Sequence, residues 1–263
     1  MGVLNITPDS FADGGRHFNA GRAVDAGLAM VDAGVDLIDV GGESTRPGAD
    51  PLPADEELRR VLPVIEGLAG RVGVPISIDT YKASVARTAL AAGASIVNDI
   101  SGLSYEPELA AIAAETRAAL VLMHTRGRSK DMYSLARYDD VAREIASELR
   151  KAIDRATSAG VSRDAIIVDP GLGFAKKAEH SYAALAAIGQ ISDWLERPIL
   201  SGPSRKSFLT AATGDRVPDA REWATAAAVT ASVLFGAHIV RVHGVAAMMD
   251  VVRVADRIRA SMS

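Results

Sequence analysis

Four times along this chain, an apolar stretch with helical spacing runs into a glycine that is followed by a short run rich in valine, isoleucine and leucine. The glycines are Gly34, Gly93, Gly160 and Gly236. Glycine suits the left-handed backbone conformation that commonly ends a helix, so each site predicts a helix that stops and leads into a strand. The repetition predicts a fold built from successive βα units.

Apolar runs that are typical of strands number about eight, the number found in a closed (β/α)8 barrel. The runs barely alternate between apolar and polar residues, as expected of parallel strands covered on both faces. The expected strands are residues 2–6, 35–40, 74–78, 95–98, 119–123, 165–168, 198–200 and 237–242. We therefore predict a single (β/α)8 TIM barrel with its ligand site at the C-terminal ends of the strands. An open doubly wound sheet is the alternative, because alternating strands and helices do not establish closure.

The chain shows no internal boundary between domains. No linker, low-complexity tract or long run of charge divides its 263 residues, so we predict one domain over residues 1–263. The hydrophobic content of 48% is enough for a sizeable buried core. The longest run without charged residues, 223–240, raises the question of a membrane span, but Gly236 divides it into a helical part and a strand-like part.

Charge and cysteine usage narrow the functional classes. The formal net charge of −4 argues against a broad basic face for nucleic acid, so an anionic ligand would need a small local site. The chain has no cysteine, which excludes disulfides, thiolate metal sites and cysteine nucleophiles. No secretory signal is visible in the sequence, and we expect a cytoplasmic protein.

Polar residues follow nearly every expected strand. In a parallel barrel, substrates bind and react at the carboxyl ends of the strands, so these side chains are expected to form one ring. In chain order they are Asn5, residues 43–46, Asp79, Asn98, Asp99, His124, Asp169, residues 204–207, Arg241 and His243.

Each of these residues has a common structural explanation when it is taken alone. Asp79 or Asp169 could cap the following helix or turn, and Lys206 could be a solvated surface lysine. Arg241 and His243 point to one face of a strand and could form a structural salt bridge. The joint pattern is harder to explain in this way, because carboxylates and amides suit a flat heterocycle while Arg, His and Lys suit an anion beside it.

Two glycine-rich connections, residues 8–15 and 41–48, follow the first two expected strands and are typical of lids over a barrel mouth. Neither carries a dinucleotide-binding fingerprint, and residues 171–174 lack its third glycine. No Walker motif occurs in the sequence. His17, His180 and His238 have no paired metal ligand at helical spacing, so structural or surface roles are favoured for them.

Eight motifs, each placed at the end of an expected strand, occur in one order along the chain. They are MGVLNITPDSFADGG at 1–15, GGESTRPGA at 41–49, SIDTYKASVA at 77–86, NDISG at 98–102, LMH at 122–124, DPGLGF at 169–174, SRKSF at 204–208 and RVH at 241–243. On these motifs the chain resembles the dihydropteroate synthase family of pterin-binding enzymes along almost its whole length.

The resemblance implies a site with three subsites and two lids. The residues that would hold the pterin ring are Asp79, Asn98, Asp169 and Lys206, with Ile100, Met123, Phe174 and Gly202 lining its slot. The pyrophosphate set is Asn5, which would bind an accompanying Mg²⁺, with Thr45, Arg241 and His243. The p-aminobenzoate set is Phe11, Thr45, Arg46, Pro47 and Ser207, where Ser207 begins an expected helix and meets the carboxylate. The implied catalytic set is Lys206, Arg241, His243, Asp13 and Arg46, and the lids carry Phe11, Asp13, Arg46 and Pro47.

The implied reaction is part of folate biosynthesis. It joins 6-hydroxymethyl-7,8-dihydropterin pyrophosphate to p-aminobenzoate and yields 7,8-dihydropteroate and pyrophosphate, with dissociative departure of the leaving group. Charge on that group would be stabilised by Mg²⁺, Arg241 and His243. The resemblance also implies a homodimer, and the alanine-rich residues 221–235 suit burial against a second subunit or a neighbouring helix. Because residues 41–48 contain no insertion, we expect sulfonamides to inhibit the protein.

The chain departs from the family pattern at four positions. Lys177 and Ser181 stand where the family has a threonine and an asparagine, Gly244 stands where an aspartate is common, and Pro203 gives an unusual approach to SRKSF. Two alternatives stay open, one an enzyme of the same barrel superfamily and the other a protein without catalytic activity. One is a pterin-binding methyltransferase, which would not need SRKSF, RVH or the two lids. The other is a non-catalytic pterin-binding homologue.

Overall fold

The computed structural model describes residues 1–6, 20–44 and 48–262. Six strands form one parallel sheet in chain order, and two further strands pair in parallel with each other. The six are β1 (Gly2–Asn5), β2 (Ile38–Gly41), β3 (Ile76–Asp79), β4 (Ile96–Asp99), β5 (Ala119–Met123) and β6 (Ile166–Asp169). The pair is β7 (Leu200–Ser201) and β8 (Ile239–Val240).

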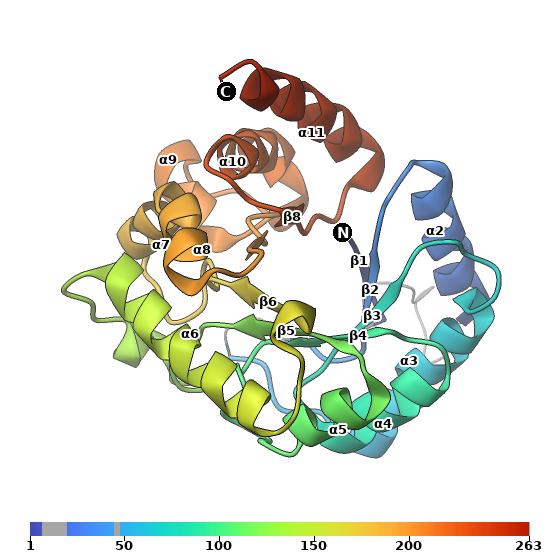
Figure 1. The fold of residues 1–263 in the computed structure, drawn as a ribbon. Helices are drawn as coiled ribbons and strands as arrows, with labels where there is room; N and C mark the ends of the chain where they lie inside the picture. The colour runs from blue at the N-terminus through green and yellow to red at the C-terminus, as the bar shows by residue number, and fades with distance from the viewer. Residues whose placement is uncertain (7–19, 45–47, 263) are drawn as a thin grey trace.

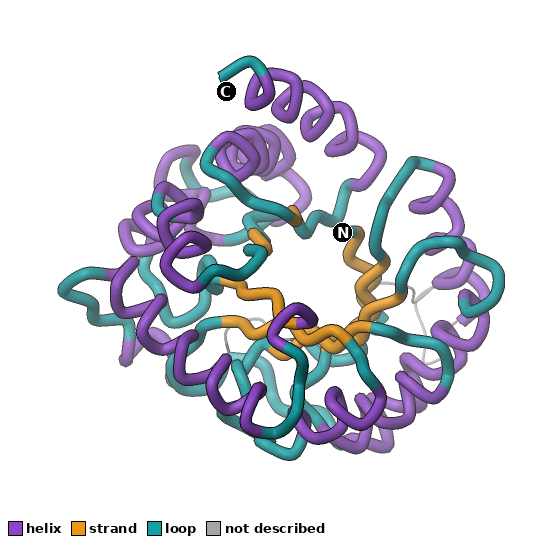
Figure 2. Tube along the Cα trace, in the orientation of Figure 1, coloured by secondary structure: helices purple, strands orange, loops and turns teal. Residues whose placement is uncertain are grey.

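Two isolated bridges join the pair to the sheet and close the ring. Val168 at β6 bridges to Ile199 before β7, and Val242 after β8 bridges to Gly2 of β1. The second seam is held by a hydrogen bond of 2.9 Å from the Val3 amide to the carbonyl of Val242. Figures 1 and 2 show the strands around the centre with helices outside them. The protein is therefore a (β/α)8 barrel, as predicted, and not an open doubly wound sheet.

The outer ring consists of helices that alternate with the strands (Figure 1). The α-helices are α2 (Ala20–Asp32), α3 (Ala54–Leu68), α4 (Ala83–Ala91), α5 (Leu109–Thr116), α6 (Val141–Ser158), α7 (Ala178–Ala186), α8 (Ile188–Leu195), α9 (Thr210–Thr213), α10 (Glu222–Leu234) and α11 (Val245–Ala260). Short 3-10 turns are η1 (Met132–Leu135), η2 (Arg163–Ala165), η3 (Ser207–Leu209) and η4 (Pro218–Arg221).

The glycines that the sequence assigned to helix ends adopt the backbone expected of them. Gly34, Gly93, Gly160 and Gly236 have φ values of 92°, 119°, 99° and 98°. The run 223–240 divides at Gly236 into α10 and β8, and none of the helices in the described part of the chain is long and apolar enough to span a membrane.

Strand bounds are less well predicted than strand order. The second strand begins at Ile38, three residues later than expected, and the two last strands shrink to two residues each.

Alternation along the strands separates two layers inside the barrel. The lower layer is an apolar cluster made of Met1, Ile96, Val121 and Leu200, packed with Leu37, Ala119, Ile167 and Ile239. The strand residues between these inward positions face the helices instead and join the main core, as Leu4, Val40 and Ile78 do. The next inward positions towards the carboxyl ends are polar on several strands. The lower part of the barrel is thus filled mainly by apolar side chains, and most of the inward polar groups lie towards its upper mouth.

Candidate active site

Four neighbouring strands bring their last inward residues to one level. Asn5 pairs in register with Gly41, Gly41 with Asp79, and Asp79 with Asn98. A Cβ at Gly41 would be in van der Waals contact with both neighbours, 3.4 Å from Asp79 Cβ, 3.6 Å from Asp79 Oδ2 and 3.7 Å from Asn5 Oδ1. The amide of Asn5 and the carboxylate of Asp79 therefore lie close together across the glycine.

Arg241, which follows β8 on the far side of β1 from β2, reaches over the mouth and connects two carboxylates. Its Nε lies 2.6 Å from Asp39 Oδ2, and its Nη2 lies 2.7 Å from Asp79 Oδ2. Asn98 Nδ2 donates to the same Asp39 oxygen at 3.0 Å. Charges inside a barrel are tolerated when they are paired and hydrogen-bonded, and this network meets that condition.

Asp169 and Lys206 lie next to this network. Asp169 is buried, and its Oδ1 accepts a hydrogen bond of 2.7 Å from the amide of Gly171. Lys206 Nζ donates to the carbonyl of Leu172 at 2.8 Å and lies 4.0 Å from the centre of the Phe174 ring. One oxygen of Asp169 therefore stabilises a turn, as the carboxylate of an isolated aspartate often does. The second oxygen is left for other partners.

An apolar wall stands beside the charged groups. Ile100 and Met123 form a small buried cluster with Tyr81, against which Phe174 packs. Gly202 also belongs to the mouth, since a Cβ on it would lie 3.9 Å from the Cβ of Arg241. A flat ring fits such a combination of apolar wall and convergent polar groups.

The charged groups change one another's titration. Burial raises the pKa of Asp79 to about 7, while Arg241 acts to lower it. Burial also raises the pKa of Asp169, and it lowers the pKa of Lys206 to about 8, against the opposing effect of Asp169. For Arg241, burial acts to lower the pKa, but Asp39 and Asp79 raise it above the ordinary value. Perturbed values concentrated at a barrel mouth are typical of a functional site.

His243 and Ser207 also lie at this end of the barrel. His243 Nδ1 is 2.9 Å from Ser204 Oγ, and the His243 amide donates to the same hydroxyl. Ser207 is exposed and begins a helix as predicted, but this helix is the three-residue turn η3 followed by the four-residue α9. The dipole of so short a helix is weaker than that of a full helix, so its amides would have to provide most of the attraction for a carboxylate.

Five expected site residues cannot be placed in this network. Phe11, Asp13, Thr45, Arg46 and Pro47 lie outside the described residues. Their roles on the two expected lids stay predictions from the resemblance.

Sequence reasoning missed Asp39, which is central to the mouth. The available signal was a charged residue inside an otherwise apolar strand, since a buried charge needs a partner. Reading only the last residue of each strand overlooked it.

A second missed network lies behind the apolar wall. Lys176 is 1% exposed, and its Nζ lies 2.8 Å from His124 Nδ1 and 3.0 Å from the carbonyl of Phe174. His124 Nε2 contacts Glu148 at 3.0 Å, and Arg126 binds the same carboxylate. Burial lowers the pKa of Lys176 to about 7 and that of His124 to about 4.

A third network anchors the start of the segment after β2. Lys82, before α4, contacts both Glu43 and Glu57, and the hydroxyl of Tyr81 donates to Glu43 at 3.0 Å. Glu57 is buried on α3, and burial raises its pKa, with Lys82 opposing this effect. One lysine thus serves two carboxylates.

A magnesium site here would depend on few protein ligands. The described residues contain no group of three or more His, Cys, Asp or Glu side chains that could hold a metal. Asn5 offers a hard amide oxygen beside Asp79, and Mg²⁺ commonly keeps several waters while it binds one or two protein oxygens and substrate phosphates. The residues present therefore fit a magnesium ion that enters with a phosphate ligand.

The comparisons with known proteins agree on one family. The family model described as pterin binding enzyme matches residues 1–243. Dihydropteroate synthase of Synechocystis is 45% identical, covering 97% of this chain and 88% of that protein, and the Mycobacterium leprae enzyme is 46% identical, covering 97% and 91%.

Solved structures give the same result. Xanthomonas albilineans dihydropteroate synthase with 4-aminobenzoic acid aligns with a TM-score of 0.91 at 41% identity, covering 98% of this chain and 92% of that one. A Yersinia pestis dihydropteroate synthase with a sulfonamide drug aligns with a TM-score of 0.92 at 39% identity, covering 98% and 93%. The strands, the ordered motifs and these alignments together show that the chain belongs to the dihydropteroate synthase family of pterin-binding enzymes.

Proposed function

We propose that this protein joins 6-hydroxymethyl-7,8-dihydropterin pyrophosphate to p-aminobenzoate, with release of pyrophosphate and formation of 7,8-dihydropteroate. The observation that carries the proposal is the convergence of Asp79, Asn98, Asp169, Lys206 and Arg241 at one barrel mouth. Solved relatives include Xanthomonas albilineans dihydropteroate synthase in complexes with 4-aminobenzoic acid and with 7,8-dihydropteroate.

The pterin would lie against the wall formed by Ile100, Met123 and Phe174. A pterin presents adjacent N–H donors on its aminopyrimidinone edge, and a carboxylate can accept two such donors together. Asp169 suits this contact because one of its oxygens is oriented by Gly171 and the other has no hydrogen bond to a described residue that fixes it. Lys206, already beside Phe174, would donate to acceptors of the ring.

The pyrophosphate would lie on the Arg241 side of the mouth. Arg241 carries two further donors on Nη1, and the planar guanidinium matches phosphate oxygens geometrically. His243 and Thr45 would complete this subsite, and Asn5 would hold the accompanying magnesium. When bound, Mg²⁺ neutralises charge on the phosphate oxygens.

In the reaction, the bond between the exocyclic methylene carbon and the pyrophosphate oxygen breaks, and a bond from that carbon to the amine nitrogen forms. The nitrogen then loses one proton, which the released pyrophosphate or solvent water accepts. Arg241 and His243 would stabilise the charge that builds on the leaving group. Lids bearing Asp13 and Arg46 would keep water from the cationic pterin, and Phe11, Pro47 and Ser207 would hold p-aminobenzoate.

A pyrophosphate-release assay tests the proposal. The protein, both substrates and Mg²⁺ should release pyrophosphate, and Lys206→Ala and Asp169→Ala should each reduce kcat/KM by about tenfold or more, as expected when a charged partner of a ligand is lost. Lys151→Ala and Asp154→Ala, on the exposed side of α6, are matched controls and should keep wild-type activity. Pterin binding without pyrophosphate release would instead identify a non-catalytic homologue.

Sulfonamide binding is expected from the same site. A solved Yersinia pestis relative holds a sulfonamide drug. We propose that sulfonamides compete with p-aminobenzoate in this protein too. Inhibition that is relieved by excess p-aminobenzoate supports this, and full activity at saturating sulfonamide contradicts it.

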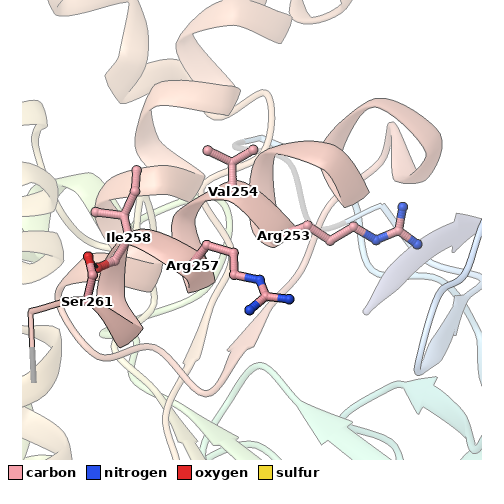
Figure 3. A pocket seen from close by; sticks show the side chains of 5 residues that line it. All are labelled: Arg253, Val254, Arg257, Ile258 and Ser261. Atoms are coloured by element: carbon pink, nitrogen blue, oxygen red, sulfur yellow. Dashed lines mark hydrogen bonds between the residues drawn. The ribbon is translucent and has the colours of Figure 1, made fainter.

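We also propose that the protein is a homodimer that uses the face formed by α10 and α11. Figure 3 shows the side chains that line a pocket at α11, among them Val254 and Ile258 together with Arg253 and Arg257. The pocket has a volume of about 540 Å³. Trp223, at the start of α10, is 87% exposed, and Val254 and Met262 are also well exposed. Val254 and Ile258 are four residues apart on α11 and therefore share one side of that helix, and an exposed apolar stripe of this kind suits a two-fold contact. Light scattering should give a dimer mass, and Val254→Glu should shift the mass towards a monomer, whereas a monomeric wild type contradicts the proposal.

The proposed enzyme is one domain over residues 1–263. All eight strands, from β1 to β8, belong to one closed barrel, which supports this proposal.

The proposal that the protein is cytoplasmic rests on the sequence, and fractionation of the cells that make the protein would test it.

A further inference from the structure

Asp39 is a fully buried carboxylate in the middle of β2. Alternation places its side chain inside the barrel, between Leu37 of the apolar layer and Gly41 at the mouth. A negative charge at this depth is strongly unfavourable unless its partners compensate for lost hydration. Its position beneath the polar ring therefore needs a physical reason.

Both hydrogen-bond partners of Asp39 belong to the candidate site. Its Oδ2 accepts from Arg241 Nε at 2.6 Å and from Asn98 Nδ2 at 3.0 Å, while its Oδ1 has no partner among the described residues. An ionised carboxylate can only accept, so the nitrogen of the Asn98 amide must face Asp39. The oxygen of that amide is then turned away from Asp39 and is available as an acceptor.

We propose that Asp39 is a positioning residue that holds Arg241 for the pyrophosphate and fixes the Asn98 amide so that it offers its oxygen to the pterin. The inference rests on the proposed function. Arg241 is held at Nε from below, which leaves Nη1 and Nη2 at the mouth, where Nη2 contacts Asp79. Holding a long side chain in place before binding reduces the entropy that the ligand would otherwise have to overcome.

Orientation and charge predict opposite effects when Asp39 is removed. The negative charge of Asp39 repels an anionic ligand, so a purely electrostatic role predicts tighter pyrophosphate binding without it. Positioning predicts weaker binding, because Arg241 loses its anchor. The sign of the change therefore distinguishes the two roles.

The test compares the binding of two ligands by calorimetry: the pterin pyrophosphate with Mg²⁺, and the corresponding pterin alcohol. The ratio of their affinities reports on the pyrophosphate subsite that includes Arg241, and the affinity for the alcohol reports on the pterin subsite that includes Asn98. We expect Asp39→Ala to lower both, the ratio by about tenfold, in line with one charge-assisted hydrogen bond. Asp39→Asn keeps an acceptor oxygen in place and should restore most of the ratio.

Two controls separate positioning from general stability. Asp99→Asn removes another buried carboxylate, one that accepts from the amides of Ser101 and Leu103, and it should lower Tm without changing the ratio. In an Arg241→Met background, Asp39→Ala should leave the ratio unchanged, because its effect acts through Arg241. If Asp39→Ala does not fold, Asp39→Ser, which withdraws the acceptor, is measured in the same way.

An unchanged or increased ratio in Asp39→Ala or Asp39→Ser overturns the inference. An unchanged affinity for the alcohol overturns its Asn98 part. A wild-type protein that releases no pyrophosphate would count against the proposed function itself, and so the two failures are distinguishable.

Discussion

Burial of the Lys176 amino group makes the free energy of unfolding of this protein depend on pH. Its pKa falls from an ordinary value of 10.5 to about 7, mainly through burial, although Asp169 opposes the shift. Between these values the unfolded chain binds a proton at Lys176 that the folded protein has released. The free energy of unfolding therefore increases as the pH rises through this window. Below about pH 7 both the folded and the unfolded state bind the proton, so this gain in stability is absent.

The size of the effect follows from the shift. Each pH unit inside the window changes the free energy of unfolding by about 1.4 kcal/mol, and the whole window amounts to a change on the order of 5 kcal/mol. Lys176→Met removes the titration and keeps a side chain of similar length. The stability of wild type relative to the Lys176→Met variant should therefore rise by about 1.4 kcal/mol for each unit of pH within the window.

Urea unfolding of both proteins at about pH 7.5 and about pH 8.5 measures this difference. Contributions from Lys206 and Asp79 occur in both proteins and largely cancel. The matched control is Lys151→Met, an exposed lysine on α6, whose stability should follow that of wild type at both pH values. A difference between wild type and Lys176→Met that stays constant with pH would refute the reasoning.

Three further predictions concern other parts of the barrel. Gly171→Ala should lower the free energy of unfolding by more than about 2 kcal/mol in urea titrations, because φ is 67° and the new Cβ would lie 2.0 Å from the carbonyl oxygen of His124; a loss below about 0.5 kcal/mol contradicts this. Lys206→Met should raise KM for the pterin substrate about tenfold and change KM for p-aminobenzoate less, whereas equal increases would argue against a pterin contact. Lys82→Met should lower the free energy of unfolding by about 3–5 kcal/mol, because two carboxylates lose their cation. Arg59→Met, at an exposed ion pair, should lower it much less, and similar losses would contradict this difference.

The order of the strands and helices could be predicted from local signals, whereas closure of the barrel was predicted only from the number of strands. Gly34 and Gly236 mark helix ends because their backbone requirement is local and visible in the sequence. Closure depends instead on Gly2 meeting Val242, a contact between the two ends of the chain that no local pattern encodes. The last strands are also short, since Leu200 and Ile239 need only a two-residue pairing to complete the ring.

The sequence predicted the site residues that end their strands, but not the residue that lies deeper in the barrel. Asp79, Asn98 and Asp169 end their strands, so the rule for parallel barrels predicts their meeting. Asp39 lies one layer deeper, and only the inward alternation of β2 brings it under Arg241. Lys176 was passed over because it follows the pocket in sequence, although the chain returns it to the back of the Phe174 wall.

Ser181 departs from the family pattern and shows that a residue beyond the pocket motif in the sequence can still lie beside the pocket in the structure. Ser181 stands where the family has an asparagine, yet it is buried and accepts from the amide of Gly173, next to Phe174. It therefore supports the pocket loop instead of merely following it.

Gly244 stands where the family commonly has an aspartate, and the structure places a carboxylate in that region by another route. Glu222, at the start of α10, would have its Oε1 2.2 Å from a Cβ at Gly244, and its Oε2 lies 3.4 Å from Arg205 Nε. An aspartate at 244 would have to displace this side chain and would bring a second negative charge beside it. The glycine therefore leaves room for the carboxylate of Glu222, which lies near the end of β8 and comes from the neighbouring helix α10. A comparison of motifs shows only that the aspartate is absent at residue 244, because it considers one position at a time.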